Sequence, residues 1–110
     1  MNHYKCYKAK VTSGTPIFPK GVQVMVSDQF RPTAALFDVK KVKHLCAPVS
    51  QSGGAVPNSD AYLVCYLAKP AKGVAKHVPV TPVYVNNELG PETLKTLKED
   101  ELCIPSVRTP

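Results

Sequence analysis

Short stretches of alternating apolar and polar residues run along this chain and predict β-strands. In the clearest one, Val22, Val24 and Val26 share one face while the residues between them share the other, which is the pattern of a half-buried strand. Eleven prolines and six glycines break the chain into short segments and leave little room for long helices. We therefore expect an all-β fold of about six strands, arranged as a small sandwich or a closed barrel.

Three segments of the chain occur twice, in the same order. They are residues 4–10 and 63–69, residues 24–30 and 83–89, and residues 45–48 and 102–105. The offset from Cys6 to Cys65 is nearly the same as the offset from Cys46 to Cys103. This repetition predicts one domain over residues 1–110 made of two pseudo-repeated, three-stranded halves. The halves span residues 1–49 and 60–110 and are joined by a polar loop, residues 50–59.

The third strand of each half is expected at corresponding positions. In the first half it is expected at Ala35–Val39. Its copy at 91–98 is also compatible with a short helix, because Pro91 and Glu92 suit the first turn of a helix. The correspondence with the first half favours a strand.

The four cysteines, Cys6, Cys46, Cys65 and Cys103, are far apart, and no two have C-x-x-C spacing. An even, widely spaced set in a small domain predicts disulfides and an oxidising compartment. Four buried free thiols in a cytosolic protein are the alternative. Four cysteines allow three connectivities, and the pseudo-symmetry is compatible with all of them. We favour Cys6–Cys46 and Cys65–Cys103, because each half then carries its own crosslink.

The net charge of +6 comes from the first half, which has eight Lys or Arg and two Asp or Glu, whereas the second half has six of each. The candidate interaction residues are a basic cluster, Lys40, Lys41 and Lys43, and an acidic run, Glu99, Asp100 and Glu101. We expect the basic half of one domain to face the acidic end of another. A solvated lysine face that protects strand edges is the simpler interpretation. A nucleic-acid site would favour arginines and stacking aromatics, and the chain has only Arg31 and Arg108.

No arrangement of residues predicts catalysis. His3, His44 and His77 could in principle form a Cys/His nucleophilic pair or a metal site, but paired cysteines leave no thiolate for either. The chain has no G-x-S-x-G, H-E-x-x-H or P-loop motif. We expect no enzyme activity, no catalytic residue, no metal and no cofactor.

A calcium site is conceivable at the ends of two equivalent strands. Asp28, Asn86, Asn87 and Glu88 offer the oxygen ligands that Ca²⁺ prefers. Asp and Asn at such positions more often form turns by accepting hydrogen bonds from nearby backbone N–H groups. We favour turns.

Six motifs together resemble an uncharacterised repeat domain that occurs in predicted secreted, often multi-domain, bacterial proteins. They are H-Y-K-C-Y-K at 3–8, D-Q-F at 28–30, H-L-C-A-P-V at 44–49, L-V-C-Y at 63–66, V-N-N-E-L-G-P-E-T-L at 85–94 and E-L-C-I-P-S at 101–106. The resemblance covers nearly the whole chain, although Leu89 stands where the family more often has Phe. It implies an extracellular setting and tandem copies, and it implies no activity.

These observations predict a secreted or cell-surface structural or binding module without catalytic activity. The expected partner is protein, either tandem copies or the chain itself. The alternative is a lysine-rich binder of anionic polymers, such as polysaccharide or nucleic acid. No apolar stretch is long enough to span a membrane, so we expect no membrane insertion.

Overall fold

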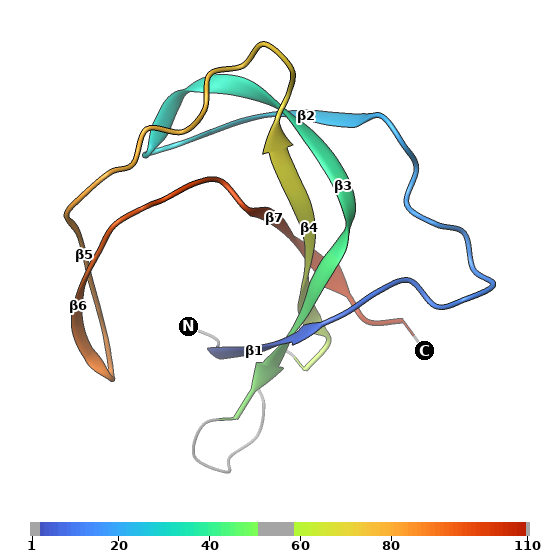
Figure 1. Ribbon diagram of the computed structural model, residues 1–110. Helices are drawn as coiled ribbons and strands as arrows, with labels where there is room; N and C mark the ends of the chain where they lie inside the picture. The colour runs from blue at the N-terminus through green and yellow to red at the C-terminus, as the bar shows by residue number, and fades with distance from the viewer. Residues whose placement is uncertain (1–2, 51–58, 110) are drawn as a thin grey trace.

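Strands, turns and irregular connections make up the computed structural model, which describes residues 3–50 and 59–109 (Figure 1). The strands are β1 (His3–Lys8), β2 (Val22–Asp28), β3 (Arg31–Val49), β4 (Ala61–Pro70), β5 (Val83–Asn87), β6 (Gly90–Leu94) and β7 (Glu101–Val107). No helix occurs in the described residues, so the all-β prediction is confirmed. The predicted alternation appears in β2, where half-buried valines alternate with exposed residues.

An antiparallel sheet with the order β1-β3-β4-β7 forms the main body, and β2 also pairs with β3. The long strand β3 holds this sheet together. One edge of β3 pairs with β2 up to Val39 and with β1 from His44 onwards. The opposite edge pairs with β4 from Phe37 to Cys46, and the pairing is irregular around Val42. Such irregularities bend a strand and increase its twist, and the sheet is visibly curved (Figure 1).

The third strand differs from its prediction in both halves. In the first half it is not limited to Ala35–Val39, because β3 extends from Arg31 to Val49. In the second half the predicted strand at 91–98 ends at Leu94, in β6, and neither the strand nor the alternative helix continues through residues 95–100. The described chain therefore has seven strands instead of about six. The predicted connecting loop, residues 50–59, lies largely outside the described residues.

The buried residues gather where β3 and β4 pair. The most buried apolar side chains are Phe37, Val39, Cys46, Cys65, Ala68 and Ala71. All of them belong to β3, to β4 or to the residue that directly follows β4. Many large apolar side chains elsewhere, including Ile17, Tyr84 and Leu97, are more than half exposed. The core is therefore a narrow zone between the two halves, which we call the central junction.

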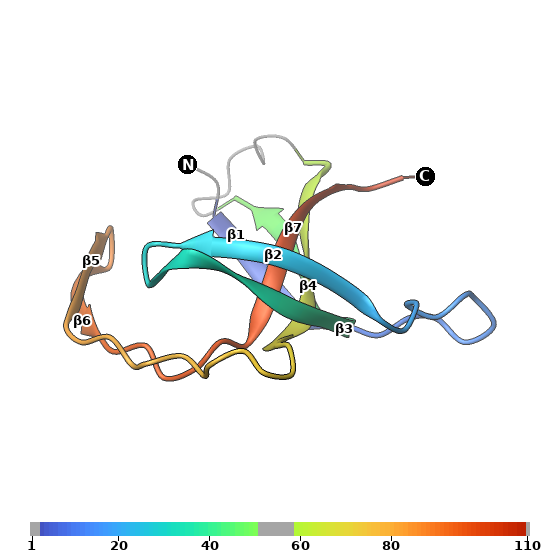
Figure 2. The ribbon, with the colours of Figure 1, turned by 90° about the horizontal axis from the view of Figure 1, so that it is seen from above.

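The molecule is open. Its radius of gyration is 16.2 Å, whereas a compact domain of this length has about 13 Å. Its accessible surface is 8603 Å², whereas about 5,900 Å² is typical of a folded monomer of this mass. Figure 2 shows the β5–β6 hairpin at one side of the main sheet and not stacked on it. The predicted closed barrel is wrong, because β1 and β7 end the sheet without pairing with each other, and the structure does not confirm a sandwich.

Candidate functional site

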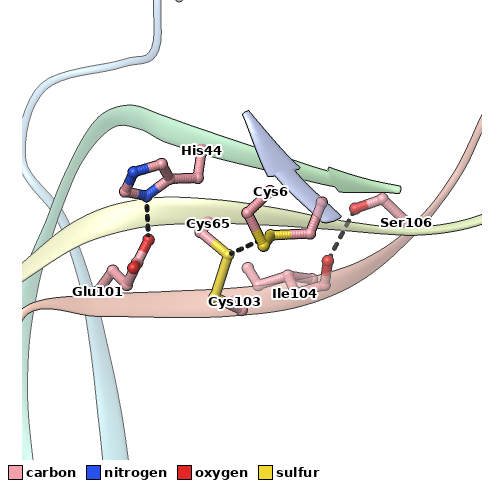
Figure 3. The surroundings of a disulfide bond; sticks show 8 residues. Cys6, His44, Cys65, Glu101, Cys103, Ile104 and Ser106 are labelled. Carbon is pink, nitrogen blue, oxygen red and sulfur yellow. Dashed lines mark hydrogen bonds and ion pairs between the residues drawn. A yellow bond between two sulfur atoms is a disulfide. The ribbon is translucent and has the colours of Figure 1, made fainter. Parts of the chain in front are cut away.

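Two disulfides cross the main sheet, in the connectivity that the sequence favours. Cys6 is bonded to Cys46, and Cys65 to Cys103, and no free cysteine is found in the described residues. Each bond joins two residues directly opposite each other on neighbouring antiparallel strands. The bonds also lie next to each other, since the Sγ atoms of Cys46 and Cys65 are 3.9 Å apart (Figure 3). One bond joins β1 to β3, and the other joins β4 to β7.

The backbone geometry around the two disulfides is nearly the same. The N–H of Ala9 donates to the C=O of Lys43 at 3.2 Å, and the N–H of Ala68 donates to the C=O of Asp100 at 3.1 Å. The two donors are related by the same offset as Cys6 and Cys65, and the two acceptors by the same offset as Cys46 and Cys103. We call residues related by these offsets equivalent. In this sense β4 is equivalent to β1, and β7 to the end of β3.

The turns also match between the halves. Gly14 and Gly73 both have φ of +86°, in turns that follow β1 and β4. At the two hairpins, Asp28 Oδ1 accepts the N–H of Phe30 at 2.7 Å, and Asn87 Oδ1 accepts the N–H of Leu89 at 2.8 Å. Asp28 and Asn87 therefore bond the turn backbone in the way expected of turn residues.

The acidic run predicted as an interaction site is paired inside the chain. Glu99 receives two bonds from the guanidinium of Arg31, at 2.7 and 3.1 Å. The other two pairs join equivalent residues across β4. Lys43 Nζ lies 2.5 Å from Asp100 Oδ1, and His44 Nδ1 lies 2.8 Å from Glu101 Oε1 (Figure 3).

These contacts shift the ionisation of two groups. The hydrogen bond from Lys43 is the main cause that lowers the pKa of Asp100 below its ordinary value. The hydrogen bond to Glu99 is the main cause that raises the pKa of Arg31. Both shifts favour the charged forms of Asp100 and Arg31.

The three predicted basic residues do not act as one cluster. Lys43 belongs to the ion pair described above, whereas Lys40 and Lys41 line a hollow of about 470 Å³ beside β3. Lys10 and Lys20, from the connection between β1 and β2, line the same hollow, together with apolar residues such as Phe18. All of its ionisable lining residues are lysines, and we call it the basic hollow.

The remaining candidates have partners of other kinds. His3 contacts Glu88, and His77 Nε2 lies 2.6 Å from Thr96 Oγ1. In the described residues, one group has metal-ligand distances, namely Cys65, Glu101 and Cys103. Its two sulfur atoms are bonded to each other, so neither is available as a thiolate.

Sequence reasoning missed the cross-strand ion pairs, although the offset between Cys46 and Cys103 also relates Lys43 to Asp100 and His44 to Glu101. A basic residue equivalent to an acidic residue, at two neighbouring positions, was the available signal. It was not recognised because these positions become neighbours only when β4 lies between β3 and β7.

Comparisons of the chain with protein-family models, with curated proteins and with solved structures give no match. No helix in the described part of the chain is long and apolar enough to cross a membrane. The two disulfides are compatible with an extracellular protein.

Proposed function

We propose that the chain is a non-catalytic structural module of a secreted or cell-surface protein. In this proposal it consists of two diverged copies of one strand unit and assembles with further copies, in tandem or by self-association. The observation that carries the proposal is the location of the core. The buried residues lie where the two halves meet, so a unit of this kind buries its apolar surface against a neighbouring unit.

Two further observations support the proposal. The unusually large accessible surface leaves apolar area for such contacts, and many large side chains outside the central junction are exposed. All four cysteines are bonded in pairs, which suits an oxidising compartment and provides no thiolate nucleophile.

Sedimentation equilibrium of the oxidised chain over a wide concentration range tests this function. We expect the average mass to rise with concentration and to pass beyond a dimer, because a contact between unlike surfaces propagates. The association should persist at high salt, since its main source is apolar and backbone contact. A mass that stays at one chain up to millimolar concentration would contradict the proposal.

The basic hollow favours a second candidate function, the binding of an anionic polymer. Four lysines, Lys10, Lys20, Lys40 and Lys41, surround a concave apolar surface without an acidic side chain in the lining. Binding of this kind weakens steeply with salt, because counterions are released.

A sulfated polysaccharide, measured by calorimetry at two salt concentrations, tests the second candidate. The double variant Lys40→Glu/Lys41→Glu should lose binding. The matched control is Lys72→Glu/Lys95→Glu, which changes the net charge equally but lies outside the basic hollow. Equal loss in both variants would mean that the polymer responds only to net charge.

A further inference from the structure

The main sheet ends at two strand edges that have no partner strand among the described residues. One is the edge of β1 that faces away from β3, and the other is the edge of β7 that faces away from β4. All residues of β1 are exposed, as are Cys103 and Ile104 in β7. The β5–β6 turn contacts β1 at its first residue, where Glu88 meets His3. Open edges of this type are templates for pairing with another strand.

The backbone groups on the free edge of β1 follow from its pairing with β3. The Cα atoms of Cys6 and Cys46 are 3.9 Å apart, which indicates a non-hydrogen-bonded pair, whereas Ala9 donates to β3. Because the pattern alternates, the N–H and C=O groups of Cys6, and those of Tyr4 and Lys8, point towards the free edge.

The same reasoning applies to β7. The Cα atoms of Cys65 and Cys103 are 3.9 Å apart, so Cys103 directs its N–H and C=O away from β4. Glu101 does the same, two residues earlier. Pro105 is next in this series and has no N–H, which ends the usable edge at Cys103.

In the central junction, the strands equivalent to β7 and β1 are already paired with each other. There, β3 joins β4 with His44 opposite Cys65 and Cys46 opposite Leu63. Since β3 is equivalent to β7 and β4 to β1, the junction shows how β7 and β1 fit together. Pairing in the junction also ends two residues before the buried Pro48, which is equivalent to Pro105.

The two terminal strands are shortened where a neighbour would lie. The last three residues of β4, Ala68 to Pro70, pair with β3, whereas β1 ends at Lys8 and its equivalent residues 9–11 are not a strand. Likewise β3 is continuous past Phe37, whereas residues 95–100, between β6 and β7, are not a strand. At both ends of the sheet, the residues equivalent to the paired segments of the central junction are therefore not strands.

Burial shows the same asymmetry. Cys46 and Cys65 are 3 % and 1 % exposed in the junction, whereas their equivalents Cys103 and Cys6 are exposed. Leu94, which the offset between Cys46 and Cys103 relates to Phe37, is 48 % exposed, whereas Phe37 is 6 % exposed.

We propose, resting on the function proposed above, that β7 of one copy pairs antiparallel with β1 of a neighbouring copy in the register of the central junction. Glu101 then lies opposite Cys6 of the neighbouring copy, and Cys103 lies opposite its Tyr4. All four residues direct their N–H and C=O groups towards the shared edge, so two hydrogen-bonded pairs form. The main sheet continues from copy to copy, head to tail.

The ion pairs fit this continuation. In the junction, Lys43 and Asp100 are equivalent residues that meet across β4. In the continued sheet, Asp100 also meets Lys43 of the neighbouring copy across its β1. The carboxylate of Asp100 then lies between the ammonium groups of two Lys43 side chains, one from each copy. Glu101 lies in the same way between two His44 side chains. Such pairs add little affinity but favour the correct orientation of the partner.

Amide hydrogen exchange of the wild-type protein, measured by NMR at micromolar and millimolar concentration, tests the register. The amides of Tyr4, Cys6, Glu101 and Cys103 should become protected at the higher concentration. The amides of Tyr7 and Leu102, which already bond within the sheet, serve as internal controls and should change little. Association without protection of the four amides would overturn the register and leave the proposed assembly function in place. Protection of β1 alone would indicate a twofold dimer and would also overturn the proposal. No association would overturn both.

Two variants at one position give a second test. Tyr4→Ala keeps the outward N–H of residue 4, whereas Tyr4→Pro removes it without removing a bond to β3. Tyr4→Pro should associate at least about tenfold more weakly than Tyr4→Ala, with the same circular dichroism spectrum and both disulfides intact. Equal association of the two variants would overturn the proposed pairing.

Discussion

The two halves of the molecule have equivalent disulfides, turns and hairpins, yet they differ in strand continuity. In the first half the chain from Arg31 to Val49 is one strand. In the second half the corresponding chain is divided into β6 and β7 by residues 95–100. The first half has β4 beside this strand, whereas the second half has no comparable neighbour among the described residues. A long strand therefore forms where a neighbour satisfies its backbone groups on both edges.

Burial follows the same difference. The first half provides Phe37 and Val39 to the core through β3, and these residues are 6 % and 5 % exposed. In the second half, Leu94 and Leu97 are 48 % and 70 % exposed. Of these residues, Phe37 and Leu94 are related by the offset between Cys46 and Cys103, so one of two equivalent apolar positions is buried and the other is exposed.

The largest expected effect comes from the two disulfides. Each closes a similar length of chain, with separations of 40 and 38 residues. The double replacements Cys6→Ser/Cys46→Ser and Cys65→Ser/Cys103→Ser should each lower the free energy of unfolding by about 4 kcal/mol. Urea unfolding measures both. A loss below about 1 kcal/mol in one variant would show that the halves are not crosslinked alike.

The next effect compares the loss of stability on removing a buried side chain of the first half with that on removing an exposed side chain of the second half. Phe37→Ala should cost about 3 kcal/mol, because it removes a buried ring from the central junction. Leu97→Ala should change stability by no more than about 0.5 kcal/mol, since the side chain is exposed. Urea unfolding at concentrations where the chain is monomeric measures both. Similar losses in the two variants would contradict the location of the core.

A smaller effect is expected at the two equivalent glycines. Gly14 and Gly73 have the same positive φ, and a Cβ at either position would meet no atom within 4 Å. Gly14→Ala and Gly73→Ala should therefore each cost about 1 kcal/mol through backbone conformation alone. Thermal unfolding that shows a clear difference between the two would mean that the turns are not equivalent.

The smallest effect concerns the exposed pair of Lys43 and Asp100. Because the pKa of Asp100 is lowered in the folded protein, the pair stabilises the fold above the ordinary pKa of an aspartate. This contribution disappears as the pH falls below about 4 and the carboxylate is protonated. Asp100→Asn should remove that part of the acid dependence. Unfolding midpoints measured from neutral to acidic pH, with Asp60→Asn as control, test this. An unchanged pH profile in Asp100→Asn would exclude the contribution.

Part of the fold could be predicted from local patterns. The alternation of Val22, Val24 and Val26 depends only on which side chains share a face of a strand, and it predicted β2 correctly. The spacing of the cysteines and the repeated segments were sufficient to favour the correct disulfide connectivity. Asp28 and Asn87 were assigned to turns because their side chains bond the backbone two residues further along.

The candidate site was less predictable. Lys40, Lys41 and Lys43 are close in sequence, but Lys40 and Lys41 line the basic hollow whereas Lys43 pairs with Asp100. The pairing of β3 with β4 is irregular at Val42, which lies between them. The partners of the acidic run, such as Arg31 for Glu99, come from distant parts of the chain. No local pattern contains that information.

The sequence by itself determined the all-β class, the alternation in β2 and the turns at Asp28 and Asn87, because these depend on residue type, side-chain alternation and short-range hydrogen bonds. It favoured the observed cysteine pairs through the repeated segments. The tertiary structure decided the length of β3, the place of the core and the choice of ion pairs. It also decided that the sheet stays open. These features depend on which strand lies beside which, and in an antiparallel sheet that neighbour determines whether backbone groups are bonded and whether an apolar side chain is buried.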